Sequence, residues 1–150
     1  MADLRELYQE VILDHHKRPR NYRKLEGANR QAVGHNPLCG DKVSLYMKVE
    51  DGIVREIGFQ GSGCAISTAS ASMMTETLKG KTEAEVEALF KRFHDLVTGK
   101  LSSDAELSSL GKLAVFSGVR EYPVRVKCAS LCWHTMRAAL EKREETVATE

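Results

Sequence analysis

The hydrophobic pattern of the chain begins with a helix. Five apolar residues near the N-terminus share one helical face: Leu4, Leu7, Tyr8, Val11 and Ile12. Asp3 and Glu6 fit the N-terminal cap of this helix, and Pro19 predicts its end because proline cannot continue a helix. The next segment, up to Asn36 and Pro37, is predicted to be irregular or an edge strand.

An alternating pattern then predicts a β-hairpin. The inward face of its first strand carries Val43, Leu45, Met47 and Val49. The dipeptide Asp51-Gly52 follows, and it suits a tight turn with positive φ angles. The second strand covers residues 53–60, and Arg55 interrupts its apolar side. Three residues form that side: Ile53, Ile57 and Phe59.

The middle of the chain predicts two helices. The first runs from Cys64 to Lys79 and is rich in small residues, which permit close packing. Its inward face is predicted to carry Ile66, Ala69, Met73 and Thr77. Thr82 and Glu85 form a capping box for the second helix, which ends at Gly99. Its core face carries Val86, Leu89, Phe90, Phe93, Leu96 and Val97.

The last third of the chain is also predicted to be mainly helical. Ser103 with Glu106 indicates another capped helix. The apolar residues of this helix are Leu107 and Leu110. Pro123 predicts an extended approach to a final helix over residues 128–143, and the tail over about 145–150 is predicted to be frayed.

Composition and element order predict one α+β domain over residues 1–150, with 42% hydrophobic and 29% charged positions. A net charge of +1 provides no global field for nucleic acid, so we expect no nucleic-acid partner. No apolar run approaches the ~20 residues that a spanning helix needs. The N-terminus also lacks the pattern of a secretory signal. We therefore expect a cytoplasmic protein that does not bind membranes.

The sequence contains four cysteines: Cys39, Cys64, Cys128 and Cys132. Disulfides are uncommon in the reducing cytosol, which favours metal binding or thiol chemistry. Cys39-Gly40-Asp41 places a thiol and a carboxylate on the same side of an extended backbone. Cys64 and Cys128 are each expected at a helix start, where the helix dipole stabilises a thiolate. Three thiolates and one carboxylate form a tetrahedral donor set suited to zinc, and less suited to a permanent iron-sulfur cluster.

Each of these residues also has a simpler interpretation. The cysteines could be buried small hydrophobes, and Asp41 could be an ordinary turn residue. Cys132 lies one helical turn after Cys128 and is interpreted as a packed core thiol, with a spare ligand or resolving cysteine as the alternative. His15 and His16 fit a solvated helix end, with partner docking as the alternative.

Four segments resemble a known family. They are Leu7-Tyr8 with Ile12-Leu13-Asp14-His15 and Pro19-Arg20-Asn21, then Asn36-Pro37-Leu38-Cys39-Gly40-Asp41, then Gly61-Ser62-Gly63-Cys64-Ala65-Ile66-Ser67, and Arg125-Val126-Lys127-Cys128. With these segments, nearly the whole chain resembles the IscU/NifU-like iron-sulfur assembly proteins. Its long stretch between Cys64 and Cys128, and Lys127 in place of the histidine of Isc-type scaffolds, make it similar to the SufU branch.

The resemblance implies an IscU/SufE-like fold, with a small three-stranded antiparallel sheet and helices packed on one face. It also implies a zinc site of Cys39, Asp41, Cys64 and Cys128, and sulfur acceptance from a cysteine desulfurase of the SufS type. Cys39 would leave zinc when the desulfurase supplies a replacement ligand, and would then take the persulfide sulfur. Arg125 would support the site by holding Asp41 or a thiolate, and a solvated arginine is the alternative.

Three functions follow for comparison. The first is a zinc-dependent sulfurtransferase that passes sulfur towards downstream cluster-assembly proteins. The second is a scaffold that assembles a [2Fe-2S] cluster, with iron on the same ligands. The third is a domain with purely structural zinc. The sequence leaves enzymatic status open, and it fits a monomer or a weak homo-oligomer.

Overall fold

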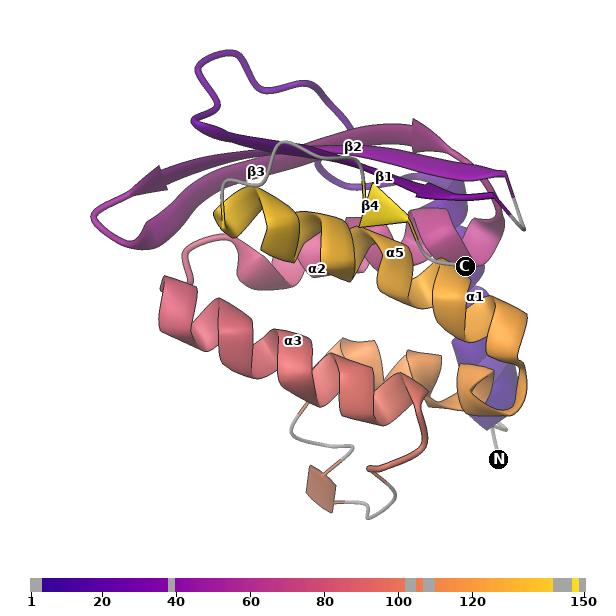
Figure 1. Cartoon of the computed structure of the whole chain (residues 1–150). Helices are drawn as coiled ribbons and strands as arrows, with labels where there is room; N and C mark the ends of the chain where they lie inside the picture. The colour runs from indigo at the N-terminus through magenta and orange to yellow at the C-terminus, as the bar shows by residue number, and fades with distance from the viewer. Residues whose placement is uncertain (1–3, 38–39, 102–104, 107–109, 142–146, 149–150) are drawn as a thin grey trace.

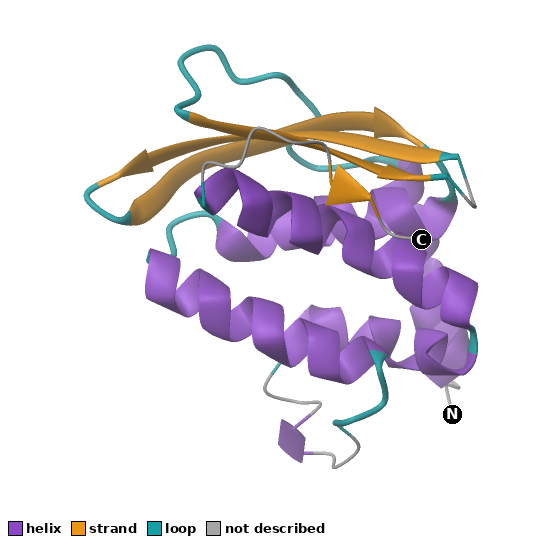
Figure 2. Cartoon of the chain, in the orientation of Figure 1, coloured by secondary structure: helices purple, strands orange, loops and turns teal. Residues whose placement is uncertain are grey.

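The computed structural model of the chain describes residues 4–37, 40–101, 105–106, 110–141 and 147–148. Its strands are β1 (Arg30–Asn36), β2 (Asp41–Glu50), β3 (Ile53–Ser62) and β4 (Val147–Ala148), in the spatial order β3-β2-β1-β4. Its helices are α1 (Leu4–Lys17), α2 (Ala65–Leu78), α3 (Glu83–Val97), α5 (Pro123–Leu140) and the 3₁₀ helix η1 (Gly111–Glu121). These helices lie on one side of the sheet (Figure 1, Figure 2), which confirms the predicted α+β fold.

The predicted hairpin is formed by β2 and β3, which pair antiparallel. The alternating apolar residues of β2 are all buried against the helices: Val43, Leu45, Met47 and Val49. Asp51 and Gly52 turn the chain with φ angles of 54° and 73°, as a type I′ turn requires.

A β-bulge changes the start of β3, and the face predicted there is wrong. Lys48 lies opposite Glu56 and Val49 opposite Val54, so Arg55 is an extra residue in the ladder. The extra residue reverses the inward and outward alternation. Val54 is therefore fully buried, whereas Ile53 is only half-buried.

The segment predicted as irregular or edge-strand structure forms β1. It pairs antiparallel with β2 from Arg30 opposite Met47 to Asn36 opposite Asp41. On its other side, β4 pairs in parallel with β1 over two residues. Part of the tail that was predicted to be frayed, residues 147–148, therefore belongs to the sheet.

The helix α2 is buried around most of its circumference, rather than on the single face that the sequence predicts. Its buried residues are Ser67, Ala69, Ser70, Ala71, Ser72, Met73, Met74, Thr75 and Leu78. Thr77, which was predicted to point inward, is only half-buried. Small side chains allow α1, α5 and β3 to contact this helix from different sides. Consequently α2 is the centre of the helical layer.

The helix α3 confirms its prediction. Thr82 Oγ1 accepts the Glu85 N–H at 3.2 Å, and Glu85 Oε1 accepts the Thr82 N–H at 3.1 Å, which completes the capping box. Phe90 and Phe93 are buried, and the Phe93 ring stacks on Trp133 with 4.5 Å between the ring centroids.

The helix predicted around Ser103 and Leu107 lies mostly outside the described residues, because both of these positions do. Of the two remaining residues used for that prediction, Glu106 is exposed and Leu110 is buried. The chain then continues directly into η1.

The helix α5 begins five residues earlier than the sequence predicts. Pro123 does not extend the chain but occupies the first turn of the helix, where a missing backbone N–H costs nothing. Cys128 therefore lies in the second turn of α5 and not at its start. The predicted C-terminal residue of this helix, Arg143, lies outside the described residues. None of the helices in the described part of the chain has the length and apolar character of a membrane-spanning segment.

The helix α1 ends at Lys17, just before Pro19, as predicted, and its predicted cap Asp3 lies outside the described residues. His15 corrects the expectation of a solvated helix end, because only 3% of its surface is exposed. Its Nδ1 lies 2.7 Å from Ser72 Oγ, and its Nε2 lies 3.6 Å from Glu76 Oε1. This imidazole therefore fastens the end of α1 to the central helix.

The buried position of His15 predicts that stability falls in mild acid. Burial lowers the pKa of His15 below its ordinary value of 6.5, and the charge of Arg20 lowers it further against the opposing effect of Glu76. Below about pH 6.5 the histidine is therefore protonated more readily in the unfolded chain than in the folded chain. The contribution of His15 to the free energy of unfolding is lost as the pH falls through this value. We expect His15→Gln to flatten the dependence of unfolding free energy on pH in metal-free protein.

Urea unfolding between about pH 7.5 and about pH 5.5 measures this effect. His16→Gln is the matched control because His16 is exposed on the same helix. If His15→Gln keeps the wild-type slope, the acid sensitivity comes from other groups.

Candidate metal centre

Three structural elements bring potential metal ligands together. Asp41 is the first residue of β2, Cys64 directly precedes α2, and Cys128 lies in α5. One carboxylate oxygen of Asp41 and the two Sγ atoms all lie within 4.8 Å of one another. These three residues are the group of metal-ligating side chains found among the described residues. Two of them are buried and Cys64 is partly exposed, so the group can be reached from solvent.

Cys64 occupies the N-cap of α2, which confirms that it lies at a helix start. Its backbone is extended, with φ −72° and ψ 164°, and its Sγ accepts the Ser67 N–H at 3.4 Å. A cap with sulfur as the acceptor leaves the side chain directed at the positive end of the helix.

Asp41 is completely buried, although it carries a carboxylate. Its Oδ1 accepts the backbone N–H of Cys64 at 2.8 Å, and its Oδ2 lies 3.8 Å from Cys64 Sγ. Gly63 allows this close approach, since a Cβ on its backbone, with φ of 152°, would overlap the Asp41 carboxylate. Gly61, near the end of β3, also lies close to β2, because a Cβ there would overlap the Lys42 carbonyl oxygen. The two glycines before Cys64 therefore let this part of the chain pack closely against the start of β2.

Cys128 completes the group from α5. It is 3% exposed, and the side-chain amide nitrogen of Asn36 lies 3.8 Å from its Sγ. Its position in the second turn of α5 removes the expected help from the N-terminus of that helix, because the dipole effect is confined to the first turn. A hydrogen-bond donor from β1 contacts this sulfur instead.

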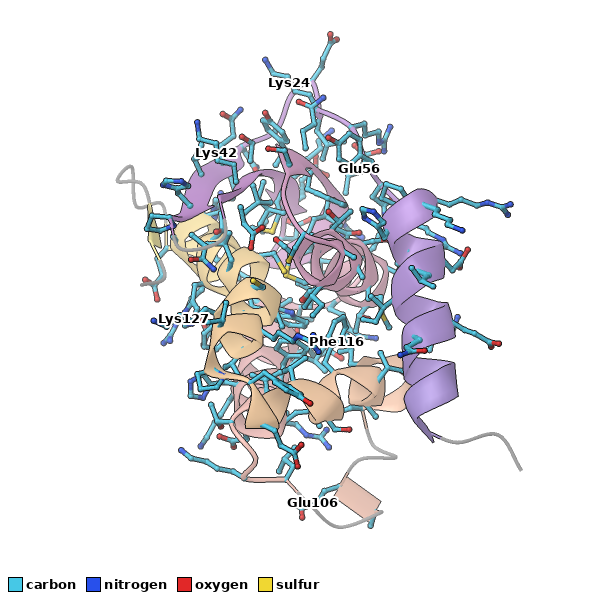
Figure 3. The ribbon with its side chains drawn as sticks, turned by 90° about the vertical axis from the view of Figure 1, so that its right-hand side faces the viewer. Lys24, Lys42, Glu56, Glu106, Phe116 and Lys127 are labelled. Atoms are coloured by element: carbon cyan, nitrogen blue, oxygen red, sulfur yellow. The ribbon has the colours of Figure 1, made fainter. Side chains whose placement is uncertain are left out.

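The remaining predicted site residues are placed as follows. Cys39 lies outside the described residues. Arg125 is exposed in the first turn of α5, with its guanidinium 4.6 Å from the centre of the Tyr122 ring. Lys42 of β2 follows Asp41, and Lys127 of α5 precedes Cys128. Both lysines lie on the left of the view in Figure 3.

Cys132 is a packed core thiol, as the favoured interpretation had it. It is 1% exposed, and its Sγ lies 3.4 Å from Ser70 Oγ. Burial raises the pKa of this thiol to about 12. Cys132 therefore stays protonated near neutral pH.

Sequence reasoning missed Asn36. The available signal was its position in β1, where every second residue, Ala32, Gly34 and Asn36, faces inward. Asn36 and Asp41 are the last paired residues of the β1–β2 ladder, and both are completely buried. Its partner Cys128 is 92 positions away in sequence. No local pattern connects two residues at that separation.

The donor set fits zinc. Zinc is bound by sulfur, nitrogen and carboxylate oxygen, and ligand atoms of a tetrahedral site lie roughly 3.3–3.8 Å apart for bond lengths of ~2.0–2.3 Å. The 3.8 Å between Cys64 Sγ and Asp41 Oδ2 lies at the upper end of that range. A buried carboxylate beside two thiols is also an unfavourable cluster of acidic groups unless a cation is shared among them.

Comparison with known proteins places the chain in a family. The NifU-like N terminal domain matches residues 7–142. The zinc-dependent sulfurtransferase SufU of Bacillus subtilis is 41% identical over 143 residues, which cover 95% of each chain. The iron-sulfur cluster assembly scaffold protein IscU of Streptococcus pyogenes is 37% identical over 142 residues, or 95% of this chain and 87% of that protein.

A crystal structure from Fervidobacterium islandicum, described as an iron-sulfur cluster assembly scaffold for the SUF system, superposes with a TM-score of 0.80. It is 37% identical and covers 87% of this chain and 94% of its own. These similarities extend over nearly the whole chain, and they agree with the fold and with the convergence of Asp41, Cys64 and Cys128. The chain thus belongs to the NifU-like N-terminal domain family, together with the SufU and IscU proteins of iron-sulfur cluster assembly.

Proposed function

We propose that this protein is a zinc-dependent sulfurtransferase of iron-sulfur cluster assembly, which accepts persulfide sulfur from a cysteine desulfurase of the SufS type. Cys39, Asp41, Cys64 and Cys128 are the proposed zinc ligands. The observation that carries the proposal is the convergence of three of these donors, from β2, α2 and α5, within 4.8 Å. The name and similarity of the Bacillus subtilis relative add support.

Cys39 is the proposed acceptor, as the family resemblance implies. It lies in the short link between Asn36 and Asp41, whose paired backbones hold the two ends of the link at the site. The Cys39 thiolate attacks the outer sulfur of the desulfurase persulfide. A new S–S bond forms on Cys39 while the persulfide S–S bond breaks, and the desulfurase cysteine departs as a thiolate, so no oxidant is consumed. Zinc, when bound, keeps the ligating thiols deprotonated and protected from other electrophiles.

A scaffold function is the second candidate. The relatives named IscU favour it, at 37% and 38% identity, because they are described as scaffold proteins. The same side chains would then hold iron, and a [2Fe-2S] cluster would be the product that leaves with a recipient protein. A purely structural zinc is the third candidate, and it predicts that the metal cannot be removed without unfolding.

The expected compartment is the reducing cytoplasm. Among the described residues, Cys64 and Cys132 are free thiols, which fits a compartment where disulfides are uncommon. Downstream cluster-assembly proteins are the expected recipients of the sulfur.

Native mass spectrometry tests the proposal. The anaerobically purified protein is incubated with a SufS-type desulfurase, cysteine and ferrous iron. We expect one zinc to be retained and one sulfur atom to be added to Cys39. Loss of zinc with a gain of two irons and two sulfides would instead establish the scaffold function. Retention of zinc with no added sulfur would leave the metal as structural.

A further inference from the structure

The three described residues of the proposed zinc site are each in contact with a protein N–H donor. Asp41 Oδ1 accepts the Cys64 N–H at 2.8 Å, and Cys64 Sγ accepts the Ser67 N–H at 3.4 Å. Cys128 Sγ faces the Asn36 side-chain amide at 3.8 Å, which is within the longer range of hydrogen bonds to sulfur. Two of these donors are backbone N–H groups, which every residue except proline carries. The third donor is a side-chain amide and therefore depends on the identity of residue 36.

The fold places the Asn36 side chain next to Cys128. Asn36 is the last residue of β1, it is completely buried, and it pairs with Asp41 across the ladder. Since α5 contacts both β1 and β2, Cys128 is brought against this end of the sheet. One polar side chain at the end of β1 thus lies beside two of the proposed ligands.

We infer that Asn36 is a positioning residue of the metal site, which orients Cys128 Sγ and moderates its negative charge through an N–H···S hydrogen bond. The inference rests on the proposed zinc site. It assigns a role to a residue that is not itself a ligand.

Charge explains why such a donor is useful there. Zinc with one carboxylate and three thiolates has a formal charge of −2, and a buried negative charge is costly unless hydrogen-bond donors surround it. Backbone N–H groups serve Asp41 and Cys64 because these residues lie at or against the start of α2. Cys128 lies inside α5, where the backbone N–H groups are used by the helix itself. The side-chain amide of Asn36, from β1, provides such a donor to its Sγ.

Two substitutions test the inference. Asn36→Ala removes the donor without adding charge, and Asn36→Asp replaces the donor with an acceptor of the same shape. We expect each variant to bind zinc about 10- to 100-fold more weakly than wild type, in competition with a chelator. In Co²⁺-loaded protein, we expect the sulfur-to-cobalt charge-transfer band to move to lower energy, because a thiolate that loses its donor is a stronger electron donor.

Asn29→Asp is the matched control. The Asn29 side chain bonds both the N–H and the C=O of Val49, at 2.8 and 2.7 Å. Val49 lies eight residues along β2 from Asp41, or about 26 Å at the usual strand rise. This variant is expected to lose stability while its cobalt band and zinc affinity stay at wild-type values.

The outcomes separate the inference from the proposed function. If Asn36→Ala keeps both the wild-type affinity and the wild-type band, Asn36 is not a positioning residue, whatever Asn36→Asp does. If wild-type protein loads zinc but accepts no sulfur, the proposed function fails while the role of Asn36 is still measured by zinc affinity and the cobalt spectrum.

Discussion

Alanine in place of Cys39 is expected to reduce sulfur loading by the desulfurase by at least about a thousandfold, because the attacking thiolate is lost. Asp41, Cys64 and Cys128 remain, so the variant should still bind zinc, more weakly than wild type. Loading is measured by mass spectrometry of the intact protein after one turnover of the desulfurase. Only the sulfur-transfer step should be lost in Cys39→Ala, and its circular dichroism spectrum should show the same fold as wild type.

Cys132→Ala is the control for this prediction. Cys132 is buried and hydrogen-bonded to Ser70, and its pKa of about 12 leaves almost no thiolate at neutral pH. Sulfur loading in Cys132→Ala should therefore equal that of wild type. Normal loading of Cys39→Ala, or a large loss in Cys132→Ala, would show that sulfur enters at another cysteine.

The parts of the fold with strong local signals could be predicted from the sequence. The β2–β3 hairpin has regular alternation and an Asp-Gly turn, and α3 has a capping box with a continuous apolar face. In both elements the local pattern and the tertiary packing agree. One residue accounts for the error in β3, because the bulge at Arg55 shifts the alternation and exchanges the roles of Ile53 and Val54.

Other features depend on packing that local patterns do not encode. The helix α2 is buried on several sides, so its sequence shows small residues and no clear apolar stripe. Pro123 is equally compatible with an extended segment and with the first turn of a helix, and the structure selects the helix. His15 has the sequence context of a solvated helix end, yet Ser72 and Glu76 from α2 surround it.

The candidate site shows the same division. Cys39-Gly40-Asp41 and the expected helix starts at Cys64 and Cys128 indicated ligands locally, and the family resemblance implied the same set. The hydrogen-bond donors of the site could not be predicted in this way. Asn36 meets Cys128 only because β1 and α5 pack together, across 92 positions of sequence.

The effect of Asp41→Asn on the free energy of unfolding is expected to have opposite signs without and with zinc. In metal-free protein, Asp41 is a fully buried carboxyl group near two thiols, whereas asparagine is neutral and keeps an oxygen that can accept the Cys64 N–H. The metal-free variant should therefore be as stable as wild type or more stable. With zinc in about 100- to 1,000-fold excess over its dissociation constant, wild type should gain about 2.7–4.1 kcal/mol, and the variant, lacking a ligand, should gain much less.

Thermal unfolding with and without zinc measures this reversal, and Asp14→Asn is the matched control. Asp14 lies on α1 and pairs with Arg20, which follows that helix, at 2.7 Å, and it is not among the grouped ligands. Its variant should gain the same stability from zinc as wild type does. If Asp41→Asn is destabilised equally with and without zinc, the main contribution of Asp41 is its hydrogen bond to the start of α2, and the metal is held without it. A reversal of the two stabilities would show that the burial of this carboxylate is offset by the cation that it binds.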